Sequence, residues 1–139
     1  INNSNIPTQV GTDNNWKSVS AGYLLAMAIK TDGTLWGWSS FVPNGIPLSG
    51  ISQKTPMQLG TENNWKEIYG GSDHNLALKN DNTLWSCGKN FNGQLGIGAS
   101  GSQLEQNSFT QIGTETNWKS ISAGTRFSLA IKNNGTIWG

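Results

Sequence analysis

The feature that most constrains the fold of this chain is a segment that occurs three times in phase. The copies read GTDNNWKSVSAGYLLAMAIKTDGTLWG from Gly11, GTENNWKEIYGGSDHNLALKNDNTLWS from Gly60 and GTETNWKSISAGTRFSLAIKNNGTIWG from Gly113. They share closing tryptophans that are spaced 49 and then 53 residues apart, namely Trp36, Trp85 and Trp138. A period of this size predicts a repeat architecture, in which each unit buries its apolar face against its neighbours.

The first half of each copy predicts a strand that ends in a glycine turn. In WKSVSAG the side chains alternate, with Trp16 and Ser18 on one face and Lys17 and Val19 on the other, as the period of a strand requires. A pair of small residues then closes the strand. Its glycine takes a positive φ or lets another backbone approach closely. These glycines are Gly22, Gly71 and Gly124.

The second half of each copy predicts a hairpin. LLAMAIK is compatible with a short helix, because Leu, Ala and Met are good helix formers. The turn that follows favours a hairpin instead, because its residue pairs tolerate the positive φ of a type I′ turn. These pairs are Asp32-Gly33, Asp81-Asn82 and Asn134-Gly135. Thr-Leu-Trp or Thr-Ile-Trp then provides a β-rich return strand.

A shorter motif precedes each copy. It reads PTQVGT from Pro7, PMQLGT from Pro56 and FTQIGT from Phe109, and the apolar residue before its glycine marks a short strand that runs into a turn. Residues 1–6 are polar, and we interpret them as a linker or as the end of a preceding blade. The sequence is therefore divided into repeat 1 at 7–54, repeat 2 at 55–107 and an incomplete repeat 3 at 108–139.

The copies resemble the regulator-of-chromosome-condensation repeat of bacterial surface and secreted proteins. The resemblance rests on WKSVSAG, on the LAIK-type and DGTLWGW-type strands, and on the glycine-rich KNFNGQLGIG from Lys89. The loop after Trp38 departs from the pattern, and the spacing from small pair to histidine survives only from Gly71 to His74. The resemblance implies an all-β fold, with about 2.6 repeats of a seven-bladed β-propeller made of four-stranded antiparallel blades.

A partial propeller of this kind exposes apolar blade faces and unpaired strand edges, which are a liability for a free protein. The sequence begins at Ile1 without a signal-peptide pattern, and it ends at Gly139, before the loop and fourth strand of the third copy. We therefore expect a fragment of a longer propeller, with further blades of the same chain among its partners.

The most tempting catalytic segment is Ser72-Asp73-His74, which places the residue types of a nucleophilic triad in a row. A triad needs three side chains that converge, whereas neighbours in an extended segment point to opposite faces. The corresponding residues are Tyr23-Leu24-Leu25 and Thr125-Arg126-Phe127, so the segment is interpreted as the variable part of a turn. No catalytic residue is predicted.

No metal site or cofactor is predicted. One histidine and one cysteine, Cys87, cannot supply the ligands of a zinc site, and the aspartates sit singly in separate loops. The glycine-rich string from Gly93 to Gly98 leads into more loop rather than into a helix, which argues against a phosphate cradle.

The seven tryptophans, three of them followed by a lysine, could form a base-stacking surface. Recurrence in phase is better explained by packing between blades, because aromatic side chains bury large areas. The recurring residues are Trp16, Trp36, Trp65, Trp85, Trp118 and Trp138. Trp38 is outside this pattern, since the second copy has Cys87 in its place.

Partner contacts are expected where the copies differ, because function tends to be grafted onto the loops of a rigid scaffold. The alternative interpretation, that these positions are merely unconstrained, stays open. The candidate contacts are Tyr23, Phe41, Asp73, His74, Lys89, Phe91, Arg126 and Phe127.

Composition narrows the class of partner. Charged residues make up 12% of the chain and the net charge is +1, so no long-range field attracts nucleic acid or an anionic membrane. The basic residues are spread along the sequence, which argues against a basic patch. No apolar run is long enough for a membrane span. Low charge with many Asn and Thr residues is common in secreted bacterial surface proteins, the location that we expect.

We therefore expect a non-catalytic binding or scaffold module, part of a secreted or cell-surface bacterial propeller that presents loops to a protein or a glycan. One alternative is a passenger region, either cargo or stalk, of a large exported protein. Another is guanine-nucleotide exchange or enzyme inhibition, which the resemblance allows but which fold alone does not warrant.

Overall fold

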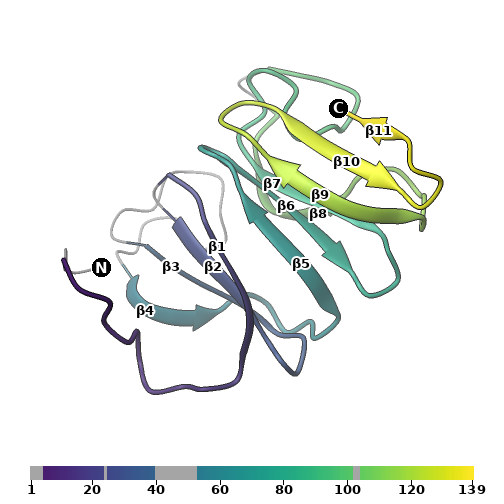
Figure 1. Ribbon diagram of the computed structural model, residues 1–139. Coiled ribbons are helices and arrows are strands. Elements are labelled where there is room, and N and C mark those ends of the chain that lie inside the picture. Colours follow the sequence, from purple (N-terminus) through teal and green to yellow (C-terminus); the bar gives the residue numbers. More distant parts are fainter. Residues whose placement is uncertain (1–4, 24, 40–52, 102–103) are drawn as a thin grey trace.

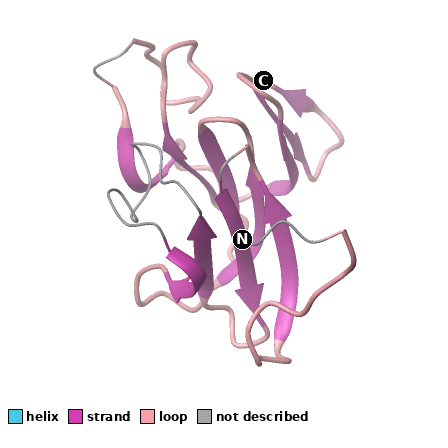
Figure 2. Ribbon diagram, turned by 90° about the vertical axis from the view of Figure 1, so that its left-hand side faces the viewer, coloured by secondary structure: helices cyan, strands magenta, loops and turns pink. Residues whose placement is uncertain are grey.

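The computed structural model describes residues 5–23, 25–39, 53–101 and 104–139, and its regular structure there is entirely β-strand (Figure 2). The first sheet contains β1 (Trp16–Ala21), β2 (Leu25–Lys30), β3 (Leu35–Ser39) and β4 (Gln53–Gln58). The second contains β5 (Trp65–Gly70), β6 (His74–Lys79), β7 (Leu84–Gly88) and β8 (Gln106–Gln111). The third contains β9 (Trp118–Ala123), β10 (Ser128–Lys132) and β11 (Ile137–Trp138).

The sheets lie side by side in chain order (Figure 1). Neighbouring strands within each sheet are antiparallel, and strand order follows the sequence. Between sheets, β5 contacts β1, β2 and β9. The predicted all-β architecture of antiparallel four-stranded sheets is confirmed. None of the described residues forms a helix that could cross a membrane.

The core lies between consecutive sheets. We call the face of a sheet that is turned toward the next sheet its front face, and the opposite one its back face. The front face of the first sheet buries Leu25, Met27 and Ile29 against Trp65 and Ile68 of the second. The second interface repeats this arrangement with Leu76, Leu78, Leu84, Trp118 and Ile121. Apolar burial therefore holds each sheet to its neighbour.

The strict alternation predicted for WKSVSAG is wrong, because a β-bulge interrupts the first strand of each sheet. The pairing of β1 with β2 shifts between Trp16 and Ser18, and β5 and β9 shift at the same place. One extra residue reverses the orientation of those that follow. Trp65 and Ile68, three positions apart, consequently belong to one core.

The shorter motif forms the second half of the fourth strand in each complete sheet. β4 and β8 run directly into Leu59 and Ile112, whose N–H groups donate to Leu35 O and Leu84 O at 2.8 Å. The repeat boundaries drawn from the sequence therefore fall inside β4 and β8. In the first copy the same motif, from Pro7, forms no strand in the structure.

Candidate functional site

The sheets have two ends that differ in kind. The hairpin end lies toward the lower right of Figure 1. It contains the three hairpins that connect β2 to β3, β6 to β7, and β10 to β11. The glycine turns that follow β1, β5 and β9 lie at the opposite end, which we call the variable-loop end. His74 pairs with Gly88, so the loop after β7 also lies there.

The hairpin end is built in the same way in each sheet. Asp81 Oδ1 accepts hydrogen bonds from Thr83 N at 3.0 Å and from the Thr83 hydroxyl at 2.6 Å. Thr83 Oγ1 in turn accepts one from Trp85 Nε1 at 2.8 Å. The two hydrogen bonds from Thr83 hold the pKa of Asp81 below its ordinary 3.8. The bond from the Thr83 hydroxyl has the larger effect, and the bond from the Thr83 N–H has the smaller one. The other two hairpins make the same bonds.

Next to each hairpin, a lysine is held between two tryptophans and an acidic residue. Lys79 Nζ lies 4.8 Å from the ring centre of Trp65 and 3.6 Å from that of Trp85. It also donates to Glu62 Oε1 at 2.6 Å. The rings meet edge to face at 5.9 Å, and Lys79 is buried, so these cation–π contacts act in a desolvated site. We call this arrangement the lysine clamp.

All three sheets carry a lysine clamp. Lys30 pairs with Asp13 at 2.9 Å, and Lys132 pairs with Glu115 at 2.6 Å. The sequence interpretation treated these acidic residues as loop and missed the clamp. Its signal was available, because the acid after Gly-Thr recurs in phase with the lysine at the end of LAIK.

The hairpins also connect consecutive sheets. Trp65 N donates to Gly33 O at 3.2 Å, and Trp118 N donates to Asn82 O at 3.3 Å. Gly33 has a φ of 82°, and a Cβ there would collide with Asn63 O. Asn82 occupies the equivalent position with a φ of 60°, which asparagine tolerates better than most residues.

At the variable-loop end, six of the predicted contact residues lie at the surface: Tyr23, Asp73, Lys89, Phe91, Arg126 and Phe127. Tyr23 and Phe91 are large exposed aromatics. Asp73 and Lys89 are half-buried and form an ion pair at 3.6 Å, and Lys89 N donates to Asp73 O at 2.8 Å. Lys89 Nζ also lies 5.7 Å from the ring centre of Phe91. The glycine turn and the loop after β7 thus form one continuous surface. Phe41 lies outside the described residues.

His74 lies inside the molecule instead, 1% exposed between the second and third sheets. Its Nε2 is 3.0 Å from Ser128 Oγ, and the Ser128 hydroxyl donates to Gln94 O at 2.6 Å. Because that hydroxyl proton is engaged, Nε2 must be the donor to Ser128. Burial lowers the pKa of His74 below its ordinary 6.5, although the neighbouring Asp73 acts the other way.

The side chains of Ser72-Asp73-His74 do not converge. Asp73 pairs outward with Lys89, while His74 is directed inward to Ser128. The His74–Ser128 separation is that of a nucleophile and its base, but the hydroxyl proton points away from the imidazole. His74 Nδ1 has no hydrogen-bond partner among the described residues, so no carboxylate orients the ring as a triad requires.

In the second and third sheets, the glycine of the small pair makes room for the residue three positions later. A Cβ on Gly71 would lie 2.5 Å from His74 Cε1, and one on Gly124 would collide with the ring of Phe127. Phe127 is therefore the structural counterpart of His74. Its ring is exposed, because no sheet covers the front face of the third sheet in this structure.

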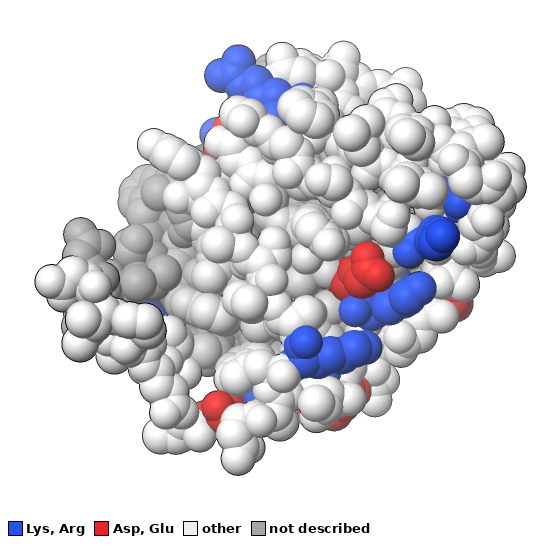
Figure 3. Space-filling model, viewed as in Figure 1, with Lys and Arg blue, Asp and Glu red and all other residues white. Residues whose placement is uncertain are grey.

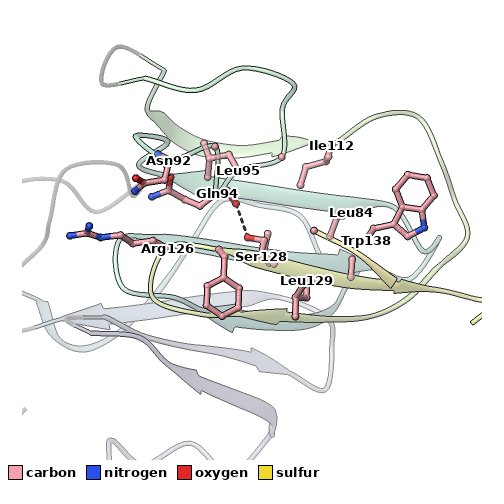
Figure 4. A pocket seen from close by; sticks show the side chains of 15 residues that line it. Leu84, Asn92, Gln94, Leu95, Ile112, Arg126, Ser128, Leu129 and Trp138 are labelled. Carbon is pink, nitrogen blue, oxygen red and sulfur yellow. Dashed lines mark hydrogen bonds between the residues drawn. The ribbon is translucent and has the colours of Figure 1, made fainter. Parts of the chain in front are cut away.

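A pocket of about 250 Å³ opens between the second and third sheets. Figure 4 shows Asn92, Gln94 and Arg126 at one side, and Leu84 with Trp138 at the other. The pocket could take a molecule with a polar and an apolar part. Sequence reasoning selected Arg126 but not Asn92 or Gln94, because their placement depends on how the loop after β7 folds over the third sheet.

The two residues without an assigned role, Cys87 and Trp38, occupy equivalent positions. Cys87 is fully buried, and desolvation raises the pKa of its thiol to about 12, which leaves it protonated and unreactive. Trp38 covers Ala26 and Ala28 on the back face of the first sheet, and its ring centre lies 6.3 Å from that of Trp16.

The repeat also aligns charged side chains. Lys17, Lys66 and Lys119 occupy the same bulged position of β1, β5 and β9, and Figure 3 shows basic groups in a row on this side with acidic groups beside it. Lysines that are spread along the sequence are thus brought close together on this face, with acidic groups beside them. Within the described part of the chain, no group of three His, Cys, Asp or Glu residues could hold a metal ion.

Stacked antiparallel four-stranded sheets define the chain as part of a β-propeller. Two models of the regulator of chromosome condensation (RCC1) repeat match it, one at residues 65–94 and one at residues 81–131. The resemblance to the RCC1 repeat that the sequence indicated is therefore confirmed over residues 65–131. No curated protein matches the sequence significantly.

Solved propellers confirm the fold. Human WBSCR16 superposes with a TM-score of 0.68 at 19% identity, covering 88% of this chain and 32% of that one. Prp20p from Saccharomyces cerevisiae gives 0.69 at 18% identity, over 87% and 32% of the two chains. Yeast RCC1 (Prp20) in its complex with Kap60 gives 0.63 at 23% identity, over 88% and 31%. The chain thus spans about a third of the length of the structures it matches.

Proposed function

We propose that this chain is a binding module whose variable-loop end contacts a protein partner. The observation that carries the proposal is the contrast between the two ends. The hairpin end repeats one set of bonds three times, whereas the variable-loop end exposes Tyr23 and Arg126, at positions where the copies differ, and Phe91 in the loop after β7. Aromatic residues and arginine are the types enriched in the energetically dominant parts of protein interfaces.

Proteins with this fold support a binding role. The structure of yeast Prp20p was described together with its binding to Gsp1p and histones, and yeast RCC1 was crystallised with Kap60 bound. The likeness covers only a third of those chains, so their partners are not transferred to this one. Binding is favoured over catalysis because the His74–Ser128 pair directs its hydroxyl proton at a carbonyl.

We place the module on a bacterial cell surface or in a secreted protein. The support is compositional: charged residues make up 12% of the chain, and neutral polar residues supply its solubility. A protein partner is preferred to a glycan because the exposed aromatics stand next to a charged pair, Asp73 and Lys89, rather than in a row that could stack on sugar rings.

The test compares two variants of equal size on the same scaffold. In the loop variant, Tyr23→Ser, Phe91→Ser and Arg126→Ser are combined; in the matched control, three exposed hairpin-end residues are changed by Lys17→Ser, Thr31→Ser and Lys119→Ser. Each protein is immobilised and exposed to extracts and medium of the producing cells, and bound proteins are quantified by mass spectrometry.

The proposal predicts a bound protein that is retained by the wild type and the control but reduced at least tenfold by the loop variant. Equal retention by all three proteins would overturn it, provided that circular dichroism shows each variant folded. A glycan array probed with the same three proteins tests whether the partner is a glycan instead. Binding to sugars in place of protein, lost in the loop variant, would overturn the choice of a protein partner.

A further inference from the structure

One set of recurring lysines has no evident role in the fold. Three lysines, Lys30, Lys79 and Lys132, are buried in the clamps, and Lys89 forms an ion pair with Asp73. The other basic side chains form no ion pair within the described part of the chain; they are Lys17, Lys54, Lys66, Lys119 and Arg126. Only Lys17, Lys66 and Lys119 among these recur at one position of the repeat.

The position that these three lysines share is the β-bulge of the first strand. Each lysine follows the first tryptophan of its copy, where the pairing register shifts by one residue. The lysine is therefore the extra residue of the bulge and has no partner on the adjacent strand. A bulge of this kind turns a side chain away from the regular alternation of the strand. We call Lys17, Lys66 and Lys119 the lysine row.

The lysine row crosses three adjoining strand edges. β1, β5 and β9 are edge strands of their sheets, and β5 contacts both β1 and β9. The row consequently runs from sheet to sheet at the hairpin end, and Figure 3 shows basic groups in such a row. Lys17 is exposed and Lys66 is half-buried although another sheet follows each of them. The accessibility of this position therefore does not depend on where the sequence stops.

Contacts within the fold do not explain why lysine recurs here. In the described part of the chain, Lys17 and Lys119 form no hydrogen bond, ion pair or ring contact. Lys66 Nζ donates to Asn82 Oδ1 at 2.9 Å, but the other two copies have glycine in place of Asn82. A lysine on a strand edge also discourages pairing with other chains. That role, however, requires no regular spacing and no partner.

The acidic groups beside the row restrict the kind of anion that fits it. Glu67 follows the lysine of β5 directly, and Asp32 and Asp81 lie in the hairpins. Hydrogen bonds from the threonine two positions later hold the pKa of each hairpin aspartate below its ordinary 3.8, so both stay ionised. A continuous polyanion would place its own charges against these carboxylates. A protein segment can alternate acidic with neutral residues, and so can match the row without this repulsion.

Spacing and an exposed aromatic residue also favour a protein segment. Stacked sheets lie about 10 Å apart, and an extended peptide advances about 3.3 Å per residue, so every third residue meets the next sheet. β5 also carries Tyr69, which is 42% exposed at a position where the other copies have Ser20 and Ser122. Tyrosine is one of the residue types enriched in protein interfaces.

We propose that the lysine row binds an extended acidic segment of a partner protein. The segment crosses β1, β5 and β9, and Asp or Glu recurs in it at about every third residue. This surface lies at the hairpin end, whereas the loops in the proposed function lie at the opposite end, so neither proposal depends on the other. The hairpin-end control described above separates them, because it removes Lys17 and Lys119 and leaves the variable loops intact.

The experiment measures binding of a labelled peptide of repeated Glu-Ser-Gly units by fluorescence anisotropy at low salt. The row variant combines Lys17→Gln, Lys66→Gln and Lys119→Gln. The matched control removes the same charge elsewhere, by Lys54→Gln, Lys89→Gln and Arg126→Gln. The wild type and the control should bind the peptide alike, whereas the row variant should bind at least tenfold more weakly.

Two outcomes of this measurement would overturn the proposal, provided that circular dichroism shows all three proteins folded. The first is that the wild type does not bind the peptide. The second is that the row variant and the control bind equally, which would leave the lysines only the role of protecting strand edges.

Two further ligands test the spacing and the class of partner. A peptide of the same composition with its glutamates in one block should bind at least threefold more weakly than the alternating peptide. Equal binding of the two peptides would overturn the spacing. A single-stranded oligonucleotide of the same charge should bind more weakly than either peptide. If it binds more tightly, and the row variant loses this binding, the choice of a protein segment is wrong.

A change at Glu67 should produce a gain rather than a loss. Glu67→Gln removes the carboxylate beside the row, so the alternating peptide should bind about threefold more tightly. Glu67→Asp keeps the charge and serves as the control, with binding like that of the wild type. Unchanged binding by Glu67→Gln would show that the peptide does not lie along the row.

Discussion

The hairpin end and the variable-loop end of the molecule show two uses of one repeat. At the hairpin end, each copy places an acid, a lysine, a threonine and two tryptophans in the same bonds. At the variable-loop end, the position of Leu25 in the first sheet is held by His74 in the second and Phe127 in the third. The bonds of the hairpin end are therefore the same in every sheet, whereas the side chains of the variable-loop end have diverged at buried as well as at exposed positions.

Among variants that test this difference between the two ends, the largest loss of stability is expected at the lysine clamp. Lys79→Ala leaves a cavity between Trp65 and Trp85 and removes the charge paired with Glu62, so the free energy of unfolding should fall by about 3 kcal/mol. Urea unfolding followed by tryptophan fluorescence measures it. The control, Lys17→Ala, removes an exposed lysine and should cost less than about 0.5 kcal/mol. Equal effects would show that the clamp is not what stabilises this end.

At the variable-loop end, only the glycine of the small pair is the same in all three copies. Its substitution should cause the second largest loss of stability. Gly71→Ala places a methyl group 2.5 Å from His74 Cε1 and 2.7 Å from Gly124 O, and backbone cannot move away as a flexible side chain would. We expect a loss of about 2 kcal/mol in thermal or urea unfolding. Ser72→Ala, one residue later, should be nearly neutral. A neutral Gly71→Ala would show that the turn adapts and that the glycine is not required.

A smaller effect is expected from the hairpin hydroxyl. Thr83→Val keeps the shape of the side chain but removes its bonds to Asp81 and Trp85 Nε1, which should lower the free energy of unfolding by about 1 kcal/mol. Thr136→Val removes the same bonds from the exposed third hairpin and should matter less. If the two variants are equally unstable, burial does not set the strength of this network.

The smallest expected effect is a pH dependence that arises only at the second glycine turn. The pKa of His74 is lowered in the folded chain, so the unfolded chain binds the proton more readily. Stability should therefore be at its full value above pH 6.5 and decrease as the pH falls below it. The difference between wild type and His74→Gln in urea titrations isolates this contribution. A difference that stays constant from pH 7.5 to pH 5 would contradict it.

The sequence was sufficient to predict the features that recur within one copy. The in-phase glycines and the Asp-Gly, Asp-Asn and Asn-Gly pairs predicted the turns and hairpins, because these conformations depend on local backbone preferences. Three copies in phase predicted stacked sheets for the same reason that any repeat protein stacks.

The features that were missed depend on contacts between segments. The bulge near Trp16 is a property of the ladder with β2, which no single strand reveals. The buried position of His74 depends on Ser128 of the next sheet, so its polarity alone suggested a surface residue. The role of Asp13 was missed because its partner, Lys30, lies 17 residues away across a strand pair, and only the recurrence of both residues in phase connects them in the sequence.

The hydrogen bonds from Trp65 to Gly33 and from Trp118 to Asn82 join only consecutive sheets. In energetic terms the chain is a row of coupled units, in which each sheet is stabilised by its immediate neighbours. The second sheet has a neighbour on both sides, and the others have one each. Amide protons of β6 and β7 should therefore exchange most slowly, while the outer sheets fray first. A contact that covers either outer face would slow exchange in that sheet before it changed exchange in the centre.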